Sequence, residues 1–392
     1  MKGVLAAIVL KGASVFTGEG ALVENATIVI DGNRISAVGT EVRIPEGARV
    51  IDAKGAVVTP GLVDAVSRLG VQDVSLEAST VEGTSGPEGG PVRASLRVAD
   101  TYNPASFTIP VARGGGITSA VVSPRGGVIS GQSIWVDLVA KQPIRERALA
   151  LHVSVQGIGA KPGARSRAFH VLREALEDAR LYRANRGPYI TRKLRELSIS
   201  AADLGAIERA LDRELKVAIH VDRASDIRGV LALVKEHRLD AILVGAAEGW
   251  KVRDEIRRAG VPVLVDPLAN LPASFNRLQA RDDNAALLHE AGVPVGITLL
   301  GDAHRAHRLR WAAGNAVADG LPYEAALAAI TRIPAQAFGI TDAGAIAPGA
   351  LANLVVWNGD PLEVTTWPTH LFIRGEQIDL RSRQDLLTER YR

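Results

Sequence analysis

The 392-residue chain contains no cysteine and one methionine. The lack of cysteine excludes disulfide bonds, thiolate zinc sites, iron–sulfur clusters and cysteine nucleophiles. Any metal ion must therefore be held by carboxylates, by a modified lysine or by some of the eight histidines. The chain also lacks an apolar run of the roughly 20 residues that a transmembrane helix needs, so we expect no membrane insertion.

The numbers of positive and negative residues are nearly equal, with 46 Lys and Arg against 43 Asp and Glu. A net charge of +3 is too small to indicate a nucleic-acid partner. Hydrophobic residues make up 47% of the chain, which is enough for a large buried core. Residues 1–11 are apolar but lack a small-residue cleavage site, which favours a β-strand over a signal peptide. Localisation is left open, with a cytoplasmic protein as the default and a periplasmic one as the alternative.

Both ends of the chain are rich in short strand-like runs. Residues 6–16, 26–30 and 34–38 are apolar runs, and Asp31-Gly32-Asn33 separates the last two. Asp-Gly between such runs predicts a β-hairpin, because these residues tolerate the positive φ of a tight turn. Strand-like sequence returns at 352–357 and 370–373. We expect the two ends to pair in one small β domain.

The middle of the chain alternates strands with amphipathic helices. Strands are predicted at 216–221, 241–244, 261–265 and 293–298, and helices at 225–236, 248–258 and 284–290. This alternation indicates parallel strands joined by right-handed crossovers. The length of the region favours a (β/α)8 barrel over a doubly wound sheet.

Two local segments carry unusual composition. Residues 161–195 hold ten Lys or Arg and three acidic residues, with helical spacing over 170–185. This pattern is typical of a solvated helix face in an insertion, and the alternative is a lid or binding surface for an acidic ligand. Ser123-Pro124-Arg125-Gly126-Gly127 resembles a phosphate loop but lacks the Walker lysine and serine, so we interpret it as a turn at a barrel end.

Several motifs then point to a family. They are Glu24-Asn25-Ala26, 31–39, Val58-Thr59-Pro60-Gly61-Leu62-Val63-Asp64, 127–132, Gly301-Asp302-Ala303-His304, Leu309-Arg310, Ala347-Pro348-Gly349 and 352–357. In this order they resemble the amidohydrolase superfamily, in its imidazolonepropionase-like and prolidase-like branch. The resemblance implies an α/β fold: a TIM-like (β/α)8 barrel at 59–344, and a small β-sandwich built from 1–58 and 345–392.

The resemblance also implies a metal site. Active members carry His-x-His at the end of the first barrel strand, a carboxylated Lys or a Glu on the fourth, histidines on the fifth and sixth, and an Asp on the eighth. These residues hold one or two divalent metals, which acidify a water molecule, and the Asp takes the proton from that water.

This sequence departs from that pattern at most of its positions. Val66 and Arg68 stand where the two histidines of the first strand are expected, and Gly245 stands at the sixth-strand histidine. Valine has no donor atom, and a guanidinium repels a cation. The fourth strand, at 149–155, contains neither Lys nor Glu, and Lys161 follows only in the next loop. We therefore predict an eroded binuclear site and assign no residue as a metal ligand.

Some candidates for chemistry remain. His220 and Asp302 match the fifth- and eighth-strand positions, and His304 follows closely, so these three are the predicted catalytic residues. With His307 one helical turn further on, they provide donors for a single zinc or similar divalent ion. The alternative is that His220 is a pocket residue bonded to a neighbour and that His304 packs locally. His152, inside an apolar strand, is interpreted as a core histidine.

The main functional hypothesis is an amidohydrolase-like protein with an eroded site, acting as a non-catalytic or metal-independent pocket protein. The alternative is an active hydrolase of C–N bonds in N-acyl amino acids, dipeptides or cyclic amides, using His220 and Asp302 with at most one metal. In either case the expected partner is a small amide or carboxylate ligand. Arg68 and Arg223 are the predicted substrate-binding residues, because arginine matches carboxylates bidentately. Self-association and pairing with an active relative both remain open.

Overall fold

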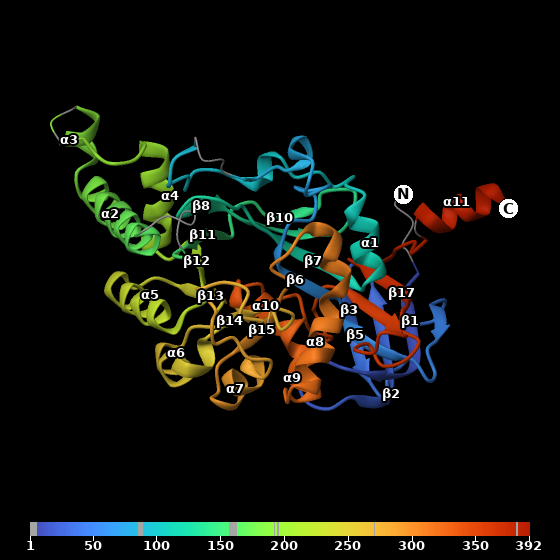
Figure 1. Cartoon of the computed structure of the whole chain (residues 1–392). Coiled ribbons are helices and arrows are strands. Elements are labelled where there is room, and N and C mark those ends of the chain that lie inside the picture. The colour runs from blue at the N-terminus through green and yellow to red at the C-terminus, as the bar shows by residue number, and fades with distance from the viewer. Residues whose placement is uncertain are drawn as a thin grey trace.

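The structure is a computed structural model that describes residues 6–84, 89–156, 163–191, 193, 196–269, 271–381 and 383–392. Figure 1 shows a mixed α/β fold in which the strands of the two chain ends lie together at one side. The middle of the chain, with its alternating strands and helices, forms the rest of the body.

Both chain ends contribute to one eight-stranded sheet. Its strands are β1 (Ile8–Val15), β2 (Val23–Asp31), β3 (Arg34–Gly39), β4 (Arg49–Asp52), β5 (Val57–Pro60), β16 (Leu354–Trp357), β17 (Pro368–Ile373) and β18 (Glu376–Gln377). Their order is β18-β17-β16-β5-β1-β2-β3, and β4 lies beside β1. Antiparallel pairing of β5 with β16, with Val58 opposite Val356, joins the two ends. The predicted pairing of the ends is confirmed, while the domain boundaries and the sandwich stay predictions.

The hairpin predicted at Asp31-Gly32-Asn33 is present. Asp31 pairs with Arg34 across the turn, and Gly32 has a φ of +57°. Ile28 and Ile30 of β2 are buried in one cluster with Phe372 of β17. The apolar alternation of the N-terminal strands thus supplies the core of this sheet.

The middle of the chain contains two further sheets. The four-stranded sheet has β6 (Leu62–Ser67), β7 (Ile117–Val122), β9 (Ile134–Asp137) and β10 (Ile144–Glu146). The six-stranded sheet has β8 (Ile129–Gln132), β11 (Ala150–Ser154), β12 (Lys216–Val221), β13 (Ala241–Gly245), β14 (Val263–Val265) and β15 (Val295–Ile297). From β11 to β15 all neighbours are parallel, as are β6 and β7. The predicted parallel strands are confirmed, but β8 runs antiparallel to β11.

The two middle sheets meet between β6 and the end of β15. Thr298 Oγ1 accepts a hydrogen bond from Val66 N at 3.1 Å and donates one to Asp64 Oδ1 at 3.1 Å. Within the described residues, β6 and β15 are not joined by backbone strand pairing, so these side-chain hydrogen bonds connect them. A continuous eight-stranded ring therefore stays a prediction, and the structure supports the coarser α/β assignment.

Helices fill the connections between strands. They are α1 (Thr108–Gly114), α2 (Ala164–Ala184), α3 (Arg186–Ile190), α4 (Ala201–Leu211), α5 (Ala224–His237), α6 (Arg253–Ala259), α7 (Asn284–Glu290), α8 (Leu309–Ala318), α9 (Tyr323–Ala329), α10 (Arg332–Ala337) and α11 (Arg383–Tyr391). Short 3-10 helices are η1 (Ala78–Thr80), η3 (Val98–Asp100), η4 (Gly249–Val252) and η5 (Ala303–Arg308). Of the apolar residues predicted to share one face of α5, Ile227, Val230 and Val234 are buried and Leu231 is partly buried. None of the described helices is both long and apolar enough to cross a membrane.

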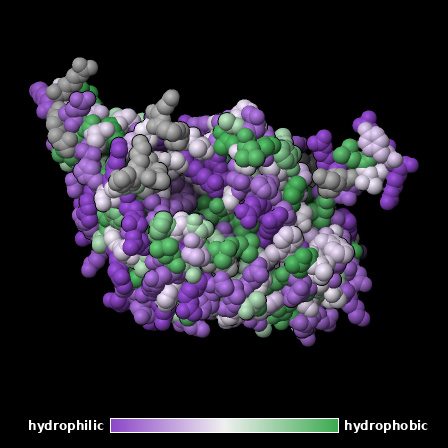
Figure 2. Space-filling model, in the orientation of Figure 1, coloured by the Kyte–Doolittle hydropathy of each residue, from purple (hydrophilic) through white to green (hydrophobic). Residues whose placement is uncertain are grey.

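The basic segment at 161–195 forms α2 and α3 where it is described. Arg173 pairs with Glu236 at 3.1 Å, and Arg186 pairs with Glu208 at 2.5 Å. Figure 2 shows mainly hydrophilic side chains on the visible face of these helices. These pairs fit the solvated helix face, because acidic side chains of the same chain neutralise part of the basic charge.

Candidate functional site

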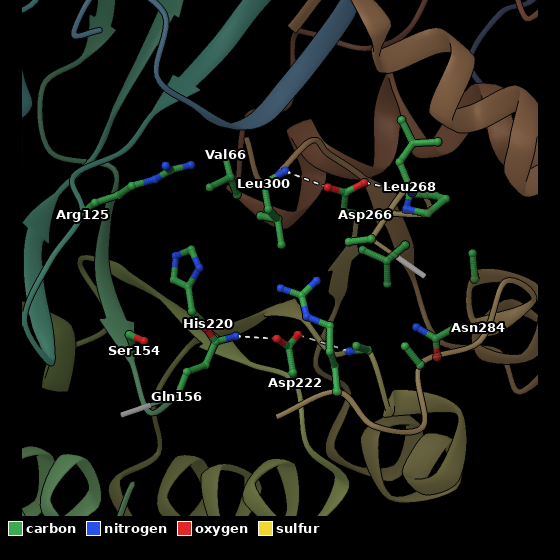
Figure 3. A pocket seen from close by; sticks show the side chains of 18 of the residues that line it. Val66, Arg125, Ser154, Gln156, His220, Asp222, Asp266, Leu268, Asn284 and Leu300 are labelled. Carbon is green, nitrogen blue, oxygen red and sulfur yellow. Dashed lines mark hydrogen bonds between the residues drawn. The ribbon is translucent and has the colours of Figure 1, made fainter. Parts of the chain in front are cut away.

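A cavity of about 490 Å³ lies at the carboxyl ends of the parallel strands; we call it the central cavity. Its lining residues are Val66, Pro124, Arg125, Gly126, Ser130, Ser154, Gln156, His220, Asp222, Gly245, Ala247, 265–269, Arg277, 280–282, Asn284, Ala285, Leu300 and Arg305. Figure 3 shows that these side chains come from several strand ends and from the loops that follow them. Parallel α/β folds place binding sites at this end because the loops after the strands converge there.

At the end of β6, Val66 and Arg68 have different surroundings. Val66 lines the central cavity and brings only methyl groups to it. Arg68 is 2% exposed and does not line the cavity. Its guanidinium donates to Ser123 O at 2.8 Å, to Thr84 Oγ1 at 3.0 Å, and to the carbonyls of Gly83 and Glu82. Burial lowers the pKa of Arg68 to about 10. The N–H groups predicted to bind substrate are thus used by protein acceptors.

His220, on β12, lines the central cavity at the position predicted for it. Its Nε2 lies 3.3 Å from Nδ1 of His152, which is fully buried on the neighbouring strand β11. Burial, helped by the positive charge of Arg125, lowers the pKa of His220 to about 4. At neutral pH this imidazole is uncharged, and one of its nitrogens already has a protein partner.

Gly245 ends β13 in a conformation that side chains rarely adopt. Its φ is +94°, and a Cβ built on it would lie 2.5 Å from Oδ1 of Asp222. Asp222 is fixed there, since it accepts hydrogen bonds from Gln156 Nε2 at 2.8 Å and from Ala247 N at 3.4 Å. Burial raises the pKa of Asp222. The carboxylate therefore fills the space that a side chain at this strand end would need.

After β15, Leu300 faces the cavity instead of Asp302. Leu300 lines the cavity, and its N–H donates to Oδ2 of Asp266 at 3.1 Å. Asp302 is not among the lining residues, and its Oδ1 accepts from Gln72 Nε2 at 3.0 Å. The 3-10 helix η5 begins directly afterwards, at Ala303, and its Arg305 lines the cavity.

The histidines of η5 also lie away from the cavity. His304 is exposed, and its carbonyl oxygen lies 2.9 Å from Nδ1 of His307, whose ring contacts Trp311 edge-on. The central cavity therefore contains His220 but neither Asp302 nor His304. Arg223, at the N-terminus of α5, also lies outside the lining. Of the three predicted catalytic residues, the structure brings His220 to this cavity and leaves Asp302 and His304 outside its lining, and their catalytic role stays a prediction.

The residues present do not fit a binuclear metal centre. Val66 and Leu300 have no donor atoms, Gly245 has no side chain, and Arg125 brings a positive charge close enough to act on His220. In the described part of the chain, no group of three or more His, Asp or Glu side chains is placed to hold a metal ion. Lys161, the lysine nearest the expected bridging position, lies outside the described residues.

The charged groups of the cavity were missed at the sequence level. Four arginines and three aspartates line it: Arg125, Arg277, Arg281, Arg305, Asp222, Asp266 and Asp282. Four positive against three negative groups leave a formal charge of +1. Asp266 directly follows β14, so a carboxylate at the end of a predicted strand was a signal that the sequence offered. Three of the arginines lie in turns and irregular loops, where periodicity gives no signal, and Arg305 lies in the short 3-10 helix η5.

The comparison with known proteins agrees with the motifs. The sequence pattern of the amidohydrolase family matches residues 179–378, which are 200 of the 392 residues. The chain belongs to the amidohydrolase family. An imidazolonepropionase from Cereibacter sphaeroides is 25% identical over 391 residues, covering 93% of this chain and 97% of the relative. Another imidazolonepropionase, from Acidiphilium cryptum, is 24% identical over 373 residues, covering 88% and 90%.

Solved structures of amidohydrolases show the same fold. An amidohydrolase from Thermotoga maritima superposes with a TM-score of 0.85 at 22% identity, over 95% of this chain and 100% of that one. A putative prolidase from Bifidobacterium longum gives a TM-score of 0.60 at 19% identity, over 99% and 100%. These structures show the shared fold, and the imidazolonepropionase relatives support the predicted branch.

Proposed function

We propose that this amidohydrolase-family protein binds a small organic ligand in the central cavity without a metal ion, as a non-catalytic or metal-independent pocket protein. The observation that carries the proposal is the set of residues at the strand ends. Val66, Gly245 and Leu300 provide no donor atoms to the cavity. A metal-activated water needs several such donors around one point.

The cavity retains the features of a small-molecule site. Its volume of about 490 Å³ lies in the range of ligand-binding cavities. Apolar side chains such as Val66, Val265 and Leu300 alternate with guanidinium and carboxylate groups. A formal charge of +1 favours a ligand with one negative charge, so a small carboxylate fits better than a neutral amide.

An active C–N hydrolase that uses His220 and Asp302 is the alternative. It needs both side chains at the same bond of the ligand. His220 lines the cavity, whereas Asp302 lies outside the lining and is bonded to Gln72. The pocket protein is therefore the better supported of the two functions.

Metal analysis of the purified protein tests the proposal. After expression in medium supplemented with zinc and manganese, followed by dialysis, we expect much less than one metal ion per chain by plasma mass spectrometry. His220→Ala should leave the metal content unchanged. Near-stoichiometric metal in the wild type, lost in His220→Ala, would overturn the proposal. A parallel screen of N-acyl amino acids, dipeptides and cyclic amides should show no turnover that depends on added metal.

A further inference from the structure

We propose that the Arg125 guanidinium occupies the region that the metal ligands surround in active relatives, and that it binds the carboxylate of the cavity ligand there. This inference rests on the proposed function and assigns the group that recognises the ligand. Arg125 belongs to the Ser123–Gly127 turn, which follows β7. This turn is not among the positions at which the family resemblance implies metal ligands.

One hydrogen bond and two electrostatic interactions place the Arg125 side chain among the strand ends. Its Nη2 donates to Gly301 O at 2.9 Å, next to the cavity residue Leu300. Its positive charge lowers the pKa of His220, so it lies close to the end of β12. It also interacts electrostatically with Asp64, two residues before Val66 on β6. Figure 3 shows the side chain extending towards Val66, with the His220 ring on the facing side.

Most of the donor capacity of Arg125 is available to a ligand. A guanidinium carries five N–H donors. In the described part of the chain, the Arg125 side chain makes one hydrogen bond, to the Gly301 carbonyl. Since the residue lines the cavity, the remaining donors can form the paired N–H···O contacts that a carboxylate accepts.

Arg277 and Arg305 interact with a carboxylate that lines the cavity, and Arg281 pairs with Asp283 just outside the lining. The lining carboxylate is that of Asp266, and Arg281 also lies over the Trp250 ring. By contrast, the acidic neighbours of Arg125 are Asp64 and Asp302, and neither lines the cavity. Within the described residues, no hydrogen bond joins Arg125 to a carboxylate, so its remaining donors are open to the carboxylate of a ligand.

Arg68 holds the loop that carries Arg125. The backbone N–H of Arg125 donates to Gly83 O at 2.9 Å. Arg68 donates to the same Gly83 carbonyl and to Ser123 O, two residues before Arg125. The arginine that stands at a histidine position of active relatives thus fixes both segments that support Arg125. We assign Arg68 as a positioning residue for Arg125.

Val66 and Gly245 complete the arrangement by leaving room. Valine is shorter than histidine and has no donor atom, so the space beside β6 stays open to a long side chain from the turn after β7. At β13 the Asp222 carboxylate fills the strand end. The replacements therefore act together, because one cationic side chain substitutes for the positive charge of the metal ions.

Binding of matched charged and uncharged probes tests the inference. The probes are benzoate and N-acetylglycine, each paired with its primary amide, measured by calorimetry or by ligand-observed NMR. We expect the wild type to bind the carboxylates at least tenfold more tightly than the amides. Arg125→Gln should lose about tenfold to 100-fold in carboxylate affinity and should lose the preference over the amide. Arg125→Lys should retain part of both.

The matched control is Arg113→Gln. Arg113 precedes β7, so it lies at the opposite end of the same strand, and its guanidinium also donates to one backbone carbonyl, that of Leu138 at 2.7 Å. This variant should bind the probes like the wild type. Arg68→Lys should weaken carboxylate binding while keeping the preference over the amide, because it shifts Arg125 without removing it.

The possible failures of the two proposals are distinguishable. If metal is absent but the wild type binds no carboxylate, or binds carboxylate and amide equally, the Arg125 inference is overturned and the metal-free cavity stands. The Arg125 inference is also overturned if the wild type, Arg125→Lys and Arg125→Gln all bind the carboxylate with equal affinity. Stoichiometric metal would instead overturn the proposed function. The wild-type comparison of carboxylate with amide needs no variant, so it remains decisive if Arg125→Gln does not fold.

Discussion

Oδ1 of Asp222 lies 2.5 Å from the position of a Cβ built on Gly245, which is closer than real Cβ atoms approach. The backbone of Gly245 has a φ of +94°, which strongly favours glycine. The backbone conformation and the neighbouring carboxylate therefore both oppose a side chain at this strand end. A histidine at residue 245 would require the Asp222 carboxylate to move.

We predict that Gly245→His neither binds zinc nor folds as stably as the wild type. The strained φ and the contact with Asp222 should together cost about 3 kcal/mol in the free energy of unfolding. Gly245→Ala separates the steric effect from the effect of the ring. Urea denaturation and metal analysis measure both quantities.

Gly260→Ala provides the control for Gly245→Ala. Gly260 has a φ of +66°, and no atom lies within 4 Å of a Cβ built there. This variant should lose about 1 kcal/mol, from the backbone conformation alone. Equal losses at the two glycines would show that the Asp222 contact has no effect, and zinc binding by Gly245→His would contradict the prediction directly.

Arg68→Met should destabilise the fold strongly. Methionine has a similar length but no donors, so the carbonyls of Ser123, Gly83 and Glu82 would lose the hydrogen bonds that Arg68 donates from its buried position. We expect a loss of about 3 kcal/mol in the free energy of unfolding. Arg228→Met removes an exposed pair with Glu255 and should change stability little. Similar small losses in both variants would refute the role of Arg68 in fastening the loops.

Asp64 should make the protein less stable at neutral than at acidic pH. Burial raises its pKa from 3.8 to about 6, so the folded state binds a proton that the unfolded state releases between these values. The stabilisation is complete below pH 3.8 and is lost as the pH rises through about 6. Asp64→Asn keeps an acceptor for Thr298 and should be more stable than the wild type at pH 7, by up to about 3 kcal/mol, but not at pH 4. Urea denaturation at both pH values checks this difference.

His220 should act in the opposite direction. Its pKa is lowered to about 4, so the unfolded state binds the additional proton between pH 4 and 6.5. The stability that its neutral form contributes is present above pH 6.5 and is lost as the pH falls through about 4. Relative to the wild type, His220→Gln should therefore lose less stability between pH 7 and pH 4.5. Parallel pH profiles of the two proteins would contradict this.

Local sequence patterns predicted the parts of the fold that depend on local physics. The Asp31–Arg34 hairpin follows from turn chemistry, and the buried stripe of α5 follows from its period. His220 was placed correctly because it lies inside a strand with a clear pattern. Its partner His152 could be predicted only as buried, since β11 and β12 are neighbours in space but 68 residues separate the two histidines.

The loops after the strands limited the prediction of the site. Asp302 lies two residues after Leu300, and sequence spacing alone could not decide which of the two faces the cavity. The 3-10 helix η5 that follows is short and has no clear periodic pattern, so it gave no further indication. Arg125 was assigned to a turn because a glycine-rich loop gives no sign of where its side chains point. Its side chain is placed by a hydrogen bond to Gly301, after β15, and by the charge of Asp64 on β6, and only the tertiary fold brings these groups together.

Asp302→Asn distinguishes the two functions that the sequence left open. If Asp302 were the base of a hydrolase, its amide would abolish turnover and leave ligand affinity nearly unchanged. Asp302 instead interacts electrostatically with Arg125 from outside the cavity. Removing its negative charge should make the surroundings of Arg125 more positive, so benzoate affinity should increase severalfold, whereas benzamide affinity should not change. Gln72 can still pair with the new amide, so thermal stability should stay close to that of the wild type. Calorimetry with the two probes measures the change, and weaker benzoate binding would contradict the role assigned to Arg125.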